Sequence, residues 1–225
     1  LKNEGLSSTS LKPIFPSKTF PNHYSIITGM YAQNHGLISN SFYSPRIDQK
    51  YSIGDKESVQ NGIWYGGEPL WITAGKNNMV SASFFWIGSE AKIKNQRPDY
   101  YHHYDGSVPG EERVDQVIKW LNLPKKNRPH FITLYFSEVD SAGHKHGPIS
   151  KEVKSALFNV DDYLHRLISK LSKIDLPVNI ILVSDHGMTQ IDDQRKVILP
   201  KKITKNQDIK IIGKGSLSLV YIKNK

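Results

Sequence analysis

Cysteine is absent from the 225 residues, and so is any long apolar run. Without cysteine the chain has no disulfides and no thiolate metal ligands, although this absence leaves the cellular compartment undecided. Because no run of about 18 apolar residues occurs, the sequence predicts no membrane-spanning helix. No internal repeat is visible either, and the length allows one sizeable core or two small ones.

The chain is basic, with 30 Lys and Arg against 21 Asp and Glu and a net charge of +9. This balance suits an anionic substrate or a polyanionic surface. The lysines gather at 201–210 and at the C-terminus, and no basic stripe with interleaved aromatic residues occurs. A solvated lysine-rich face is therefore favoured over nucleic-acid binding, and we expect no stable nucleic-acid complex.

Short apolar runs alternate with stretches of helical periodicity along the chain. The run at 130–136 is almost continuously apolar, which is typical of a strand buried on both faces. Ser150 is placed to cap a helix that extends to about Leu171. This alternation favours an α/β fold with helices on the faces of a sheet. The expected strands are 79–86, 130–136, 178–183 and 216–222, the expected helices are 18–31, 69–75, 111–121 and 150–171, and 39–75 is otherwise expected to be loop, anchored by Trp64, Tyr65 and Trp71.

Thr19 is the candidate nucleophile. Pro21 is favoured in the first turn of a helix, because its missing N–H costs nothing there. A hydroxyl at that end lies beside unpaired backbone N–H groups and the positive end of the helix dipole, and Lys18 adds a full charge. This is a site for an anion such as a phosphate. Taken alone, Thr19 is more readily explained as a helix N-cap, and the residues below reverse that preference.

Two groups of acidic and histidine residues follow the two strongest predicted strands. Asp140 and His144 stand on either side of Gly143, which permits a bend that would let both side chains converge on one ion. Asp185 and His186 are adjacent, so on an extended chain their side chains point opposite ways and could share a metal only where the chain turns. Asp and His together are ligands for a divalent metal such as zinc. Alone, the Asp185–His186 group could be a turn after a strand with the aspartate capping the next helix, and the spacing of Asp140 and His144 is only a weak sign of a metal site.

Several segments together resemble the nucleotide pyrophosphatase/phosphodiesterase family of the alkaline phosphatase superfamily. They are KTFPNHYSIITGMYAQNHGLISNSFY, WYGGEPLW, FFWIGSE, DGSVPGEER, RPHFITLYFSEVDSAGHKHGP and ILVSDHGM. The resemblance runs from about residue 7 to residue 190 and implies an α/β fold with an alkaline-phosphatase-like three-layer core and a mixed, mostly parallel sheet. It also implies a hydrolase of phosphodiester or pyrophosphate bonds in nucleotides.

The resemblance assigns the chemistry to five residues. Thr19 matches the threonine that is covalently nucleotidylated and that also touches one zinc ion. Asp185 and His186 match ligands of that ion, and Asp140 and His144 match ligands of a second zinc. Two ions together would hold the attacking and leaving oxygens of a phosphoryl displacement.

The resemblance also assigns substrate contacts. Asn40 matches an asparagine that donates a hydrogen bond to a phosphoryl oxygen. Phe20 and Tyr101 fall where family members hold a nucleobase between aromatic faces, and Lys18 matches a lysine near the nucleotide. The alternatives to Tyr101 are Tyr100 and Tyr104.

Two of the family's six Asp and His zinc ligands have no counterpart here: an aspartate of an upstream strand and a histidine of a downstream block. We therefore expect residues 1–225 to be part of a longer catalytic domain, with each metal short of one ligand. The family usually works outside the cytoplasm, which predicts an extracytoplasmic location. The alternatives are a phosphodiesterase of lipid or choline head groups, a phosphomonoesterase of the same superfamily, or a catalytically incompetent binding domain.

Overall fold

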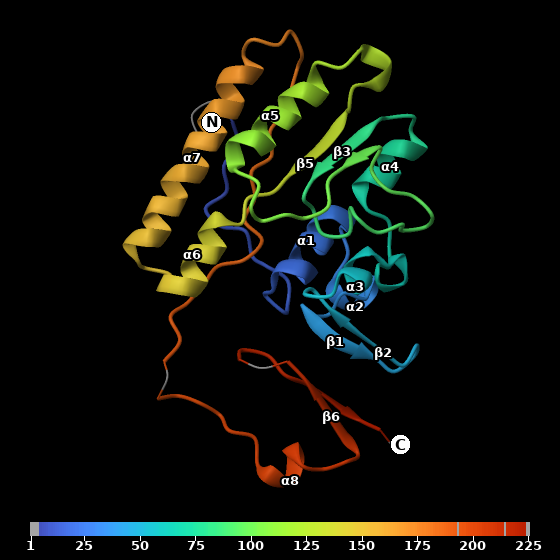
Figure 1. The fold of residues 1–225 in the computed structure, drawn as a ribbon, viewed down its shortest axis with the longest axis vertical. Helices are drawn as coiled ribbons and strands as arrows, with labels where there is room; N and C mark the ends of the chain where they lie inside the picture. The colour runs from blue at the N-terminus through green and yellow to red at the C-terminus, as the bar shows by residue number, and fades with distance from the viewer. Residues whose placement is uncertain (1–4, 193, 214, 224–225) are drawn as a thin grey trace.

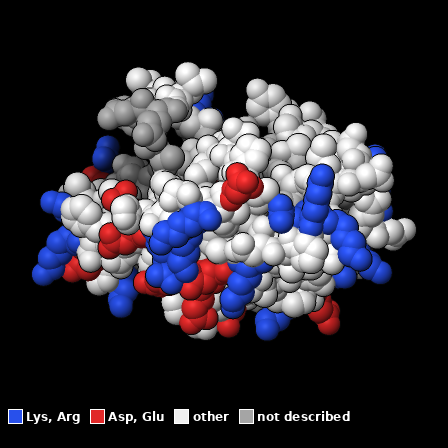
Figure 2. All heavy atoms as spheres, turned by 90° about the horizontal axis from the view of Figure 1, so that it is seen from above, with Lys and Arg blue, Asp and Glu red and all other residues white. Residues whose placement is uncertain are grey.

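The computed structural model describes residues 5–192, 194–213 and 215–223 (Figure 1). The outermost residues of the predicted domain, 1–4 and 224–225, lie outside this part of the chain. Among the described residues, no helix has the length and apolarity needed to cross a bilayer. On the face shown in Figure 2, the lysine and arginine side chains that are described lie among carboxylates and form no single stripe.

Three parallel strands form the central sheet, in the order β4–β3–β5. β3 lies in the middle and all of its residues are buried, as expected for a strand covered on both faces. In Figure 1, α5 and α7 lie on one side of this sheet and α4 lies on the other. This arrangement confirms the predicted α/β class. The strands are β3 (Ser81–Phe84), β4 (Tyr100–Tyr101) and β5 (Phe131–Leu134), and the helices are α4 (Leu70–Lys76), α5 (Gly110–Leu121) and α7 (Lys151–Leu171).

Helices α5 and α7 pack as their periodicity predicts. Val114 of α5 and Leu167 of α7 are buried in one apolar cluster with β3. Outside this cluster Asp115 accepts two hydrogen bonds from Arg166, at 2.8 and 3.0 Å, which ties the two helices together. Ser150 is the N-cap of α7, as predicted, and its hydroxyl accepts from a first-turn N–H. The helices therefore form one outer layer over the sheet.

The segment 39–75 holds more regular structure than predicted. Trp64, Tyr65 and Trp71 are all buried, so their predicted role as anchors is confirmed. They pack with α1 and with an antiparallel hairpin, β1–β2. From residue 19 to residue 64 the elements are α1 (Thr19–Thr28), α2 (Ala32–His35), β1 (Ser41–Ser44), β2 (Gln49–Ser52), α3 (Lys56–Gln60) and the short 3₁₀ helix η1 (Gly62–Trp64).

The predicted strand at 178–183 is wrong. The segment has no regular secondary structure, and its apolar side chains are exposed, Ile181 by 86% and Leu182 by 62%. A strand needs a neighbour to pair its backbone groups. Residues 178–183 pair with no strand among the described residues. β5, which pairs only with β3 there, is therefore left as an edge strand. For the same reason β5 is mostly half-buried rather than buried on both faces.

The predicted strand at 216–222 is present as β7 (Leu219–Ile222), but it does not join the central sheet. It pairs antiparallel with β6 (Ile209–Ile212) in a separate hairpin. This β6–β7 hairpin contacts β1, where the N–H of Tyr43 donates to the Tyr221 hydroxyl at 3.1 Å. The remaining elements are η2 (Lys125–Asn127), α6 (Glu138–His146) and α8 (Lys201–Thr204).

Candidate active site

Helix α1 begins at Thr19, close to the predicted start. The residue in the N-cap position is Lys18, in an extended conformation and without a side-chain cap, so the alternative role of Thr19 as N-cap is wrong. The approach to the helix is held by buried Asn22. Its Oδ1 accepts from the N–H of Ile14 at 2.8 Å, and its Nδ2 donates to the carbonyl of Lys18 at 2.9 Å. These bonds fix the position of the Thr19 hydroxyl at the start of α1.

The hydroxyl of Thr19 meets His186, although 167 positions separate the two residues. Thr19 Oγ1 lies 3.2 Å from His186 Nε2, and His186 Nδ1 lies 2.9 Å from the carbonyl of Gly187. A carbonyl only accepts, so Nδ1 carries the ring proton and Nε2 keeps a free lone pair toward Thr19. Asp185 Oδ2 is 3.3 Å from the same Nε2, so the chain turns enough for these adjacent side chains to converge.

Sequence reasoning missed His23, which is buried on α1 one turn after Thr19. Its Nδ1 lies 2.9 Å from the carbonyl of Thr19 and 3.2 Å from Asp185 Oδ2. Both partners are acceptors, so Nδ1 carries the proton and donates to them. The rings of Trp86 and Tyr135 pack edge-on against the imidazole at 4.8 and 5.0 Å. The i, i+4 spacing from Thr19 was the available signal, but it becomes informative only once Asp185 is placed.

The carboxyl group of Asp185 is kept ionised by these neighbours. Burial by itself would raise its pKa, but the hydrogen bond from His23 and the electrostatic effect of the neighbouring His23 and His186 rings outweigh burial and lower the pKa. An ionised carboxylate, a free imidazole lone pair and a hydroxyl therefore meet at the start of α1. This is a donor set suited to a cation.

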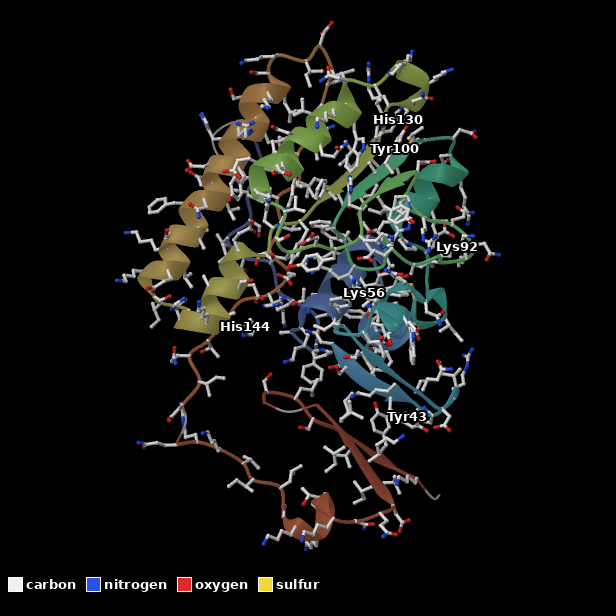
Figure 3. All side chains as sticks on the ribbon, viewed as in Figure 1. Tyr43, Lys56, Lys92, Tyr100, His130 and His144 are labelled. Atoms are coloured by element: carbon white, nitrogen blue, oxygen red, sulfur yellow. The ribbon has the colours of Figure 1, made fainter. Side chains whose placement is uncertain are left out.

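Asp140 and His144 lie on helix α6, with His144 near its C-terminal end (Figure 3). Asp140 Oδ1 is 3.4 Å from His144 Nε2, and this carboxylate oxygen is buried without a hydrogen-bond partner. The predicted bend at Gly143 is wrong, because α6 runs through it and the i, i+4 spacing alone aligns the two side chains. Gly143 instead leaves room for Met188, whose sulfur occupies the place of a side chain there.

The carboxylates of both Asp–His groups influence the phenol of Tyr135, which directly follows β5. The pKa of the Tyr135 phenol is raised, first by burial and then by Tyr104, Asp185, Asp140 and Glu138. Carboxylates from two distant segments therefore act on one ring. Their shared location is the carboxyl end of the parallel sheet, where functional groups of such folds gather.

The two aromatic residues assigned to the nucleobase contact different neighbours. Phe20 is half-buried and packs edge-on against Tyr51 at 6.2 Å. Tyr101 lies on the edge strand β4, under the guanidinium of Arg97 at 5.4 Å. Of the two alternatives to Tyr101, Tyr100 packs against Trp120, whereas Tyr104 is 51% exposed and its ring contacts Tyr135. Tyr104 is thus the best placed of the three tyrosines.

Asn40 and Lys18 lie beside the start of α1. The Oδ1 atom of Asn40 accepts from the N–H of Phe20 at 3.1 Å, which leaves Nδ2 to donate to a ligand. Lys18 and Asn40 line one cleft. A hydroxyl, an amide donor and a positive charge therefore surround the start of α1.

A sequence model described as type I phosphodiesterase / nucleotide pyrophosphatase matches residues 1–225. The chain belongs to this family. A human family member, ectonucleotide pyrophosphatase/phosphodiesterase family member 1, is 45% identical over 214 residues, which cover 94% of the chain and 23% of the relative. A venom phosphodiesterase of Naja atra is 43% identical over 197 residues, covering 87% of the chain and 24% of the relative.

The fold also matches solved structures of the family. Murine ectonucleotide pyrophosphatase/phosphodiesterase 5 superposes with a TM-score of 0.87 at 32% identity, over 95% of this chain and 57% of that one. A second structure of the murine protein is of an inactive threonine-to-alanine variant in complex with AMP. The chain spans about a quarter of the length of the curated relatives it matches. These likenesses confirm the resemblance and the alkaline-phosphatase-like α/β fold.

Proposed function

We propose that this chain carries the active-site threonine of a zinc-dependent phosphodiesterase that hydrolyses phosphodiester or pyrophosphate bonds of nucleotides. The observation that carries the proposal is the meeting of Thr19 Oγ1 with His186 Nε2 at 3.2 Å, beside Asp185 at the start of α1. A hydroxyl at this point is next to a potential metal ligand and to the side-chain amide of Asn40, which holds the N–H of Phe20. That is the requirement for attack on a phosphorus.

The donor atoms fit zinc in their spacing. Ligand atoms about 2.0–2.2 Å from a tetrahedral zinc ion lie roughly 3.3–3.6 Å from each other. The distances are 3.3 Å for Asp185–His186 and 3.4 Å for Asp140–His144, within this range, and 3.2 Å for Thr19–His186, just below it. The unpartnered buried oxygen of Asp140 is a further sign of a missing cation. No group of three or more His, Cys, Asp or Glu side chains among the described residues is arranged to hold one ion, so each pair needs additional ligands.

Each residue of the site then has a task. Zinc, when bound by Asp185 and His186 and by Asp140 and His144, supplies positive charge and lowers the pKa of a coordinated hydroxyl. Thr19 Oγ1 forms a bond to the phosphorus as the leaving-group oxygen departs. Water then replaces the threonine and restores its hydroxyl. Asn40 Nδ2 donates to the phosphoryl oxygen on which charge develops.

The relatives support this proposal. Loss of a threonine side chain accompanies inactivity in the murine protein, and the same structure contains AMP, a product expected of nucleotide cleavage. Relatives named as ectonucleotide and venom enzymes support an extracytoplasmic location for this protein. Phe20 and Tyr104 are the candidates for contact with the base, Tyr101 being a less favourably placed one.

Zinc analysis tests the proposal directly. The protein should be expressed with the flanking sequence of its own reading frame, because the chain spans part of its relatives. We expect about two zinc ions per chain, hydrolysis of the nitrophenyl ester of thymidine monophosphate, loss of that activity with a chelator and its return with zinc. A folded protein without zinc or hydrolysis would instead be a binding domain, and the proposal would be wrong.

His23 should position Asp185, and this gives a second prediction. Replacing the ring donor in His23→Phe should weaken zinc binding about 10-fold to 100-fold, the range seen for residues that orient metal ligands. His23→Asn keeps a donor near the Nδ1 position and should restore much of the affinity. Chelator competition measures the change.

The control for His23 is His35→Phe. His35 is equally buried but packs between Ser25 and Tyr24, without a contact to Asp185. It should lower the melting temperature without weakening zinc binding by the folded protein. Equal zinc affinity in His23→Phe and the unsubstituted protein would show that His23 only fills space.

A further inference from the structure

Arg113 of α5 is a charged side chain that is only 1% exposed and has no task in the proposed chemistry. Its Nε donates to the carbonyl of Val108 at 3.0 Å, and its Nη1 donates to the carbonyl of Tyr135 at 2.9 Å. Its Nη2 lies 3.8 Å from a carboxylate oxygen of Glu138. The guanidinium also lies 5.2 Å from the centre of the Phe85 ring. Burying a charge is costly, and these contacts offset that cost.

The contacts of Arg113 join the two segments that precede the Asp140–His144 pair. Tyr135 directly follows β5, and Glu138 is the first residue of α6, the helix that follows β5 along the chain (Figure 1). Asp140 belongs to the first turn of this helix. One guanidinium therefore holds both ends of the short link in which the chain changes from strand to helix. This fixes where α6 begins relative to the sheet.

Glu138 depends on this contact. The other oxygen of its carboxylate, Oε2, is buried without a hydrogen-bond partner among the described residues. Arg113 supplies a positive charge that compensates for this burial. A planar guanidinium presents five donors in a rigid fork, whereas a lysine ammonium is a single point charge on a flexible stem. Lysine at this position would keep the charge but would not hold two carbonyls and a carboxylate in one geometry.

We propose that Arg113 is a positioning residue for the metal ion held by Asp140 and His144. By fixing the start of α6, it sets where these two ligand atoms lie. The inference rests on the proposed zinc-dependent function and adds a residue that acts on one of the two ions. The other ion depends on a different segment, in which Asp185 accepts a hydrogen bond from His23. Arg113 and His23 should therefore each govern a separate ion.

Arg113→Lys tests this role in the protein expressed with its flanking sequence. Helix α6 also packs against α7, so the change should shift the start of α6 rather than unfold it. Chelator competition should show one zinc ion bound about tenfold more weakly, the lower end of the range for residues that orient metal ligands, and the other unchanged. Asp140→Asn identifies the affected ion. Adding Arg113→Lys to Asp140→Asn should leave the affinity for the remaining ion unchanged, because both changes act on the same site.

Arg166→Lys is the matched control, since Arg166 donates two hydrogen bonds to Asp115 and joins α7 to α5 rather than α6 to β5. It should lower the melting temperature and leave both zinc affinities unchanged. Equal weakening of both ions by Arg113→Lys, or weakening of neither, would overturn the positioning role.

Glu138→Gln decides the matter if Arg113→Lys does not fold. It removes the ion pair and keeps Arg113 with its two carbonyl contacts. It should weaken the same ion and spare the other, and the absence of such a selective effect would contradict the proposal. An unsubstituted protein that folds without binding zinc would instead reject the proposed function itself.

Discussion

Thr19→Ala should lower turnover of the nitrophenyl ester by at least about 1,000-fold, because the residue supplies the atom that bonds to phosphorus. The change removes only a hydroxyl and a methyl group. Thr19 is half-buried and caps no helix, so the melting temperature should move little. A large loss of kcat in a protein of unchanged stability is expected only for a residue that takes part in the chemistry.

Thr19→Ser is the control, since it keeps the nucleophilic oxygen. We expect it to retain activity within about tenfold of the unsubstituted protein, while the alanine variant stays near background. Acid quenching during turnover, followed by mass spectrometry of peptides that contain residue 19, should show a covalent nucleotide adduct. Turnover by Thr19→Ala above a tenth of normal would rule out Thr19 as the nucleophile.

The parts of the site that sequence reasoning located are those whose geometry is local. Thr19 at the start of a helix follows from Pro21 and the periodicity after it, and α1 begins there. The pairing of Asp140 with His144 follows from their i, i+4 spacing, although they lie on a continuous helix rather than around a bend. Local rules of this kind are sufficient because both partners belong to one element.

The parts that sequence reasoning missed depend on distant neighbours. Residues 178–183 have the composition of a buried strand, but strand formation depends on a pairing edge that composition does not reveal. His23 acquires a role only because Asp185 comes to lie 3.2 Å away. Tyr101 and Tyr104 are indistinguishable in sequence, yet only Tyr104 contacts Tyr135.

One of the elements that sequence reasoning missed nevertheless has a recognisable turn in its sequence. The hairpin β1–β2 surrounds a turn in which Pro45 is followed by Asp48, and Asp48 adopts φ of 50°. Proline and aspartate are common in such turns, and aspartate tolerates the left-handed conformation better than most residues. The two strands are short and half-polar, so the absence of an apolar run concealed them. The missed hairpin matters because it forms a wall of the cleft beside Thr19.

Acid should destabilise the protein through His35, which is fully buried. Its Nδ1 accepts from the N–H of Leu37 at 3.2 Å, so the proton resides on Nε2, which lies 2.9 Å from Ser25 Oγ. Protonation of Nδ1 would break the first bond and place a charge in the core. Burial accordingly lowers the pKa of His35 from 6.5 to about 4, against smaller opposing contributions from backbone hydrogen bonds at Pro21 and His35.

The sign of the effect follows from proton binding. Between pH 6.5 and about 4 the unfolded chain binds a proton at His35 and the folded chain does not, so the free energy of unfolding falls as pH falls. The loss should reach about 3 kcal/mol, a large part of a typical domain's stability. Urea unfolding at a series of pH values measures it.

A variant isolates the contribution of His35 from other titrating groups. His35→Gln should be less stable at pH 7 but should lose about 3 kcal/mol less between pH 6.5 and 4, because glutamine does not titrate. The depressed pKa of Asp115, about 2, moves its own stabilising contribution to lower pH, so it falls mostly outside this window. Parallel pH profiles for His35→Gln and the unsubstituted protein would mean that His35 is hydrated enough to accept a proton in the folded state. In that case its ring would be a surface-like histidine rather than the neutral hydrogen-bonded link between α1 and α2 that the structure shows.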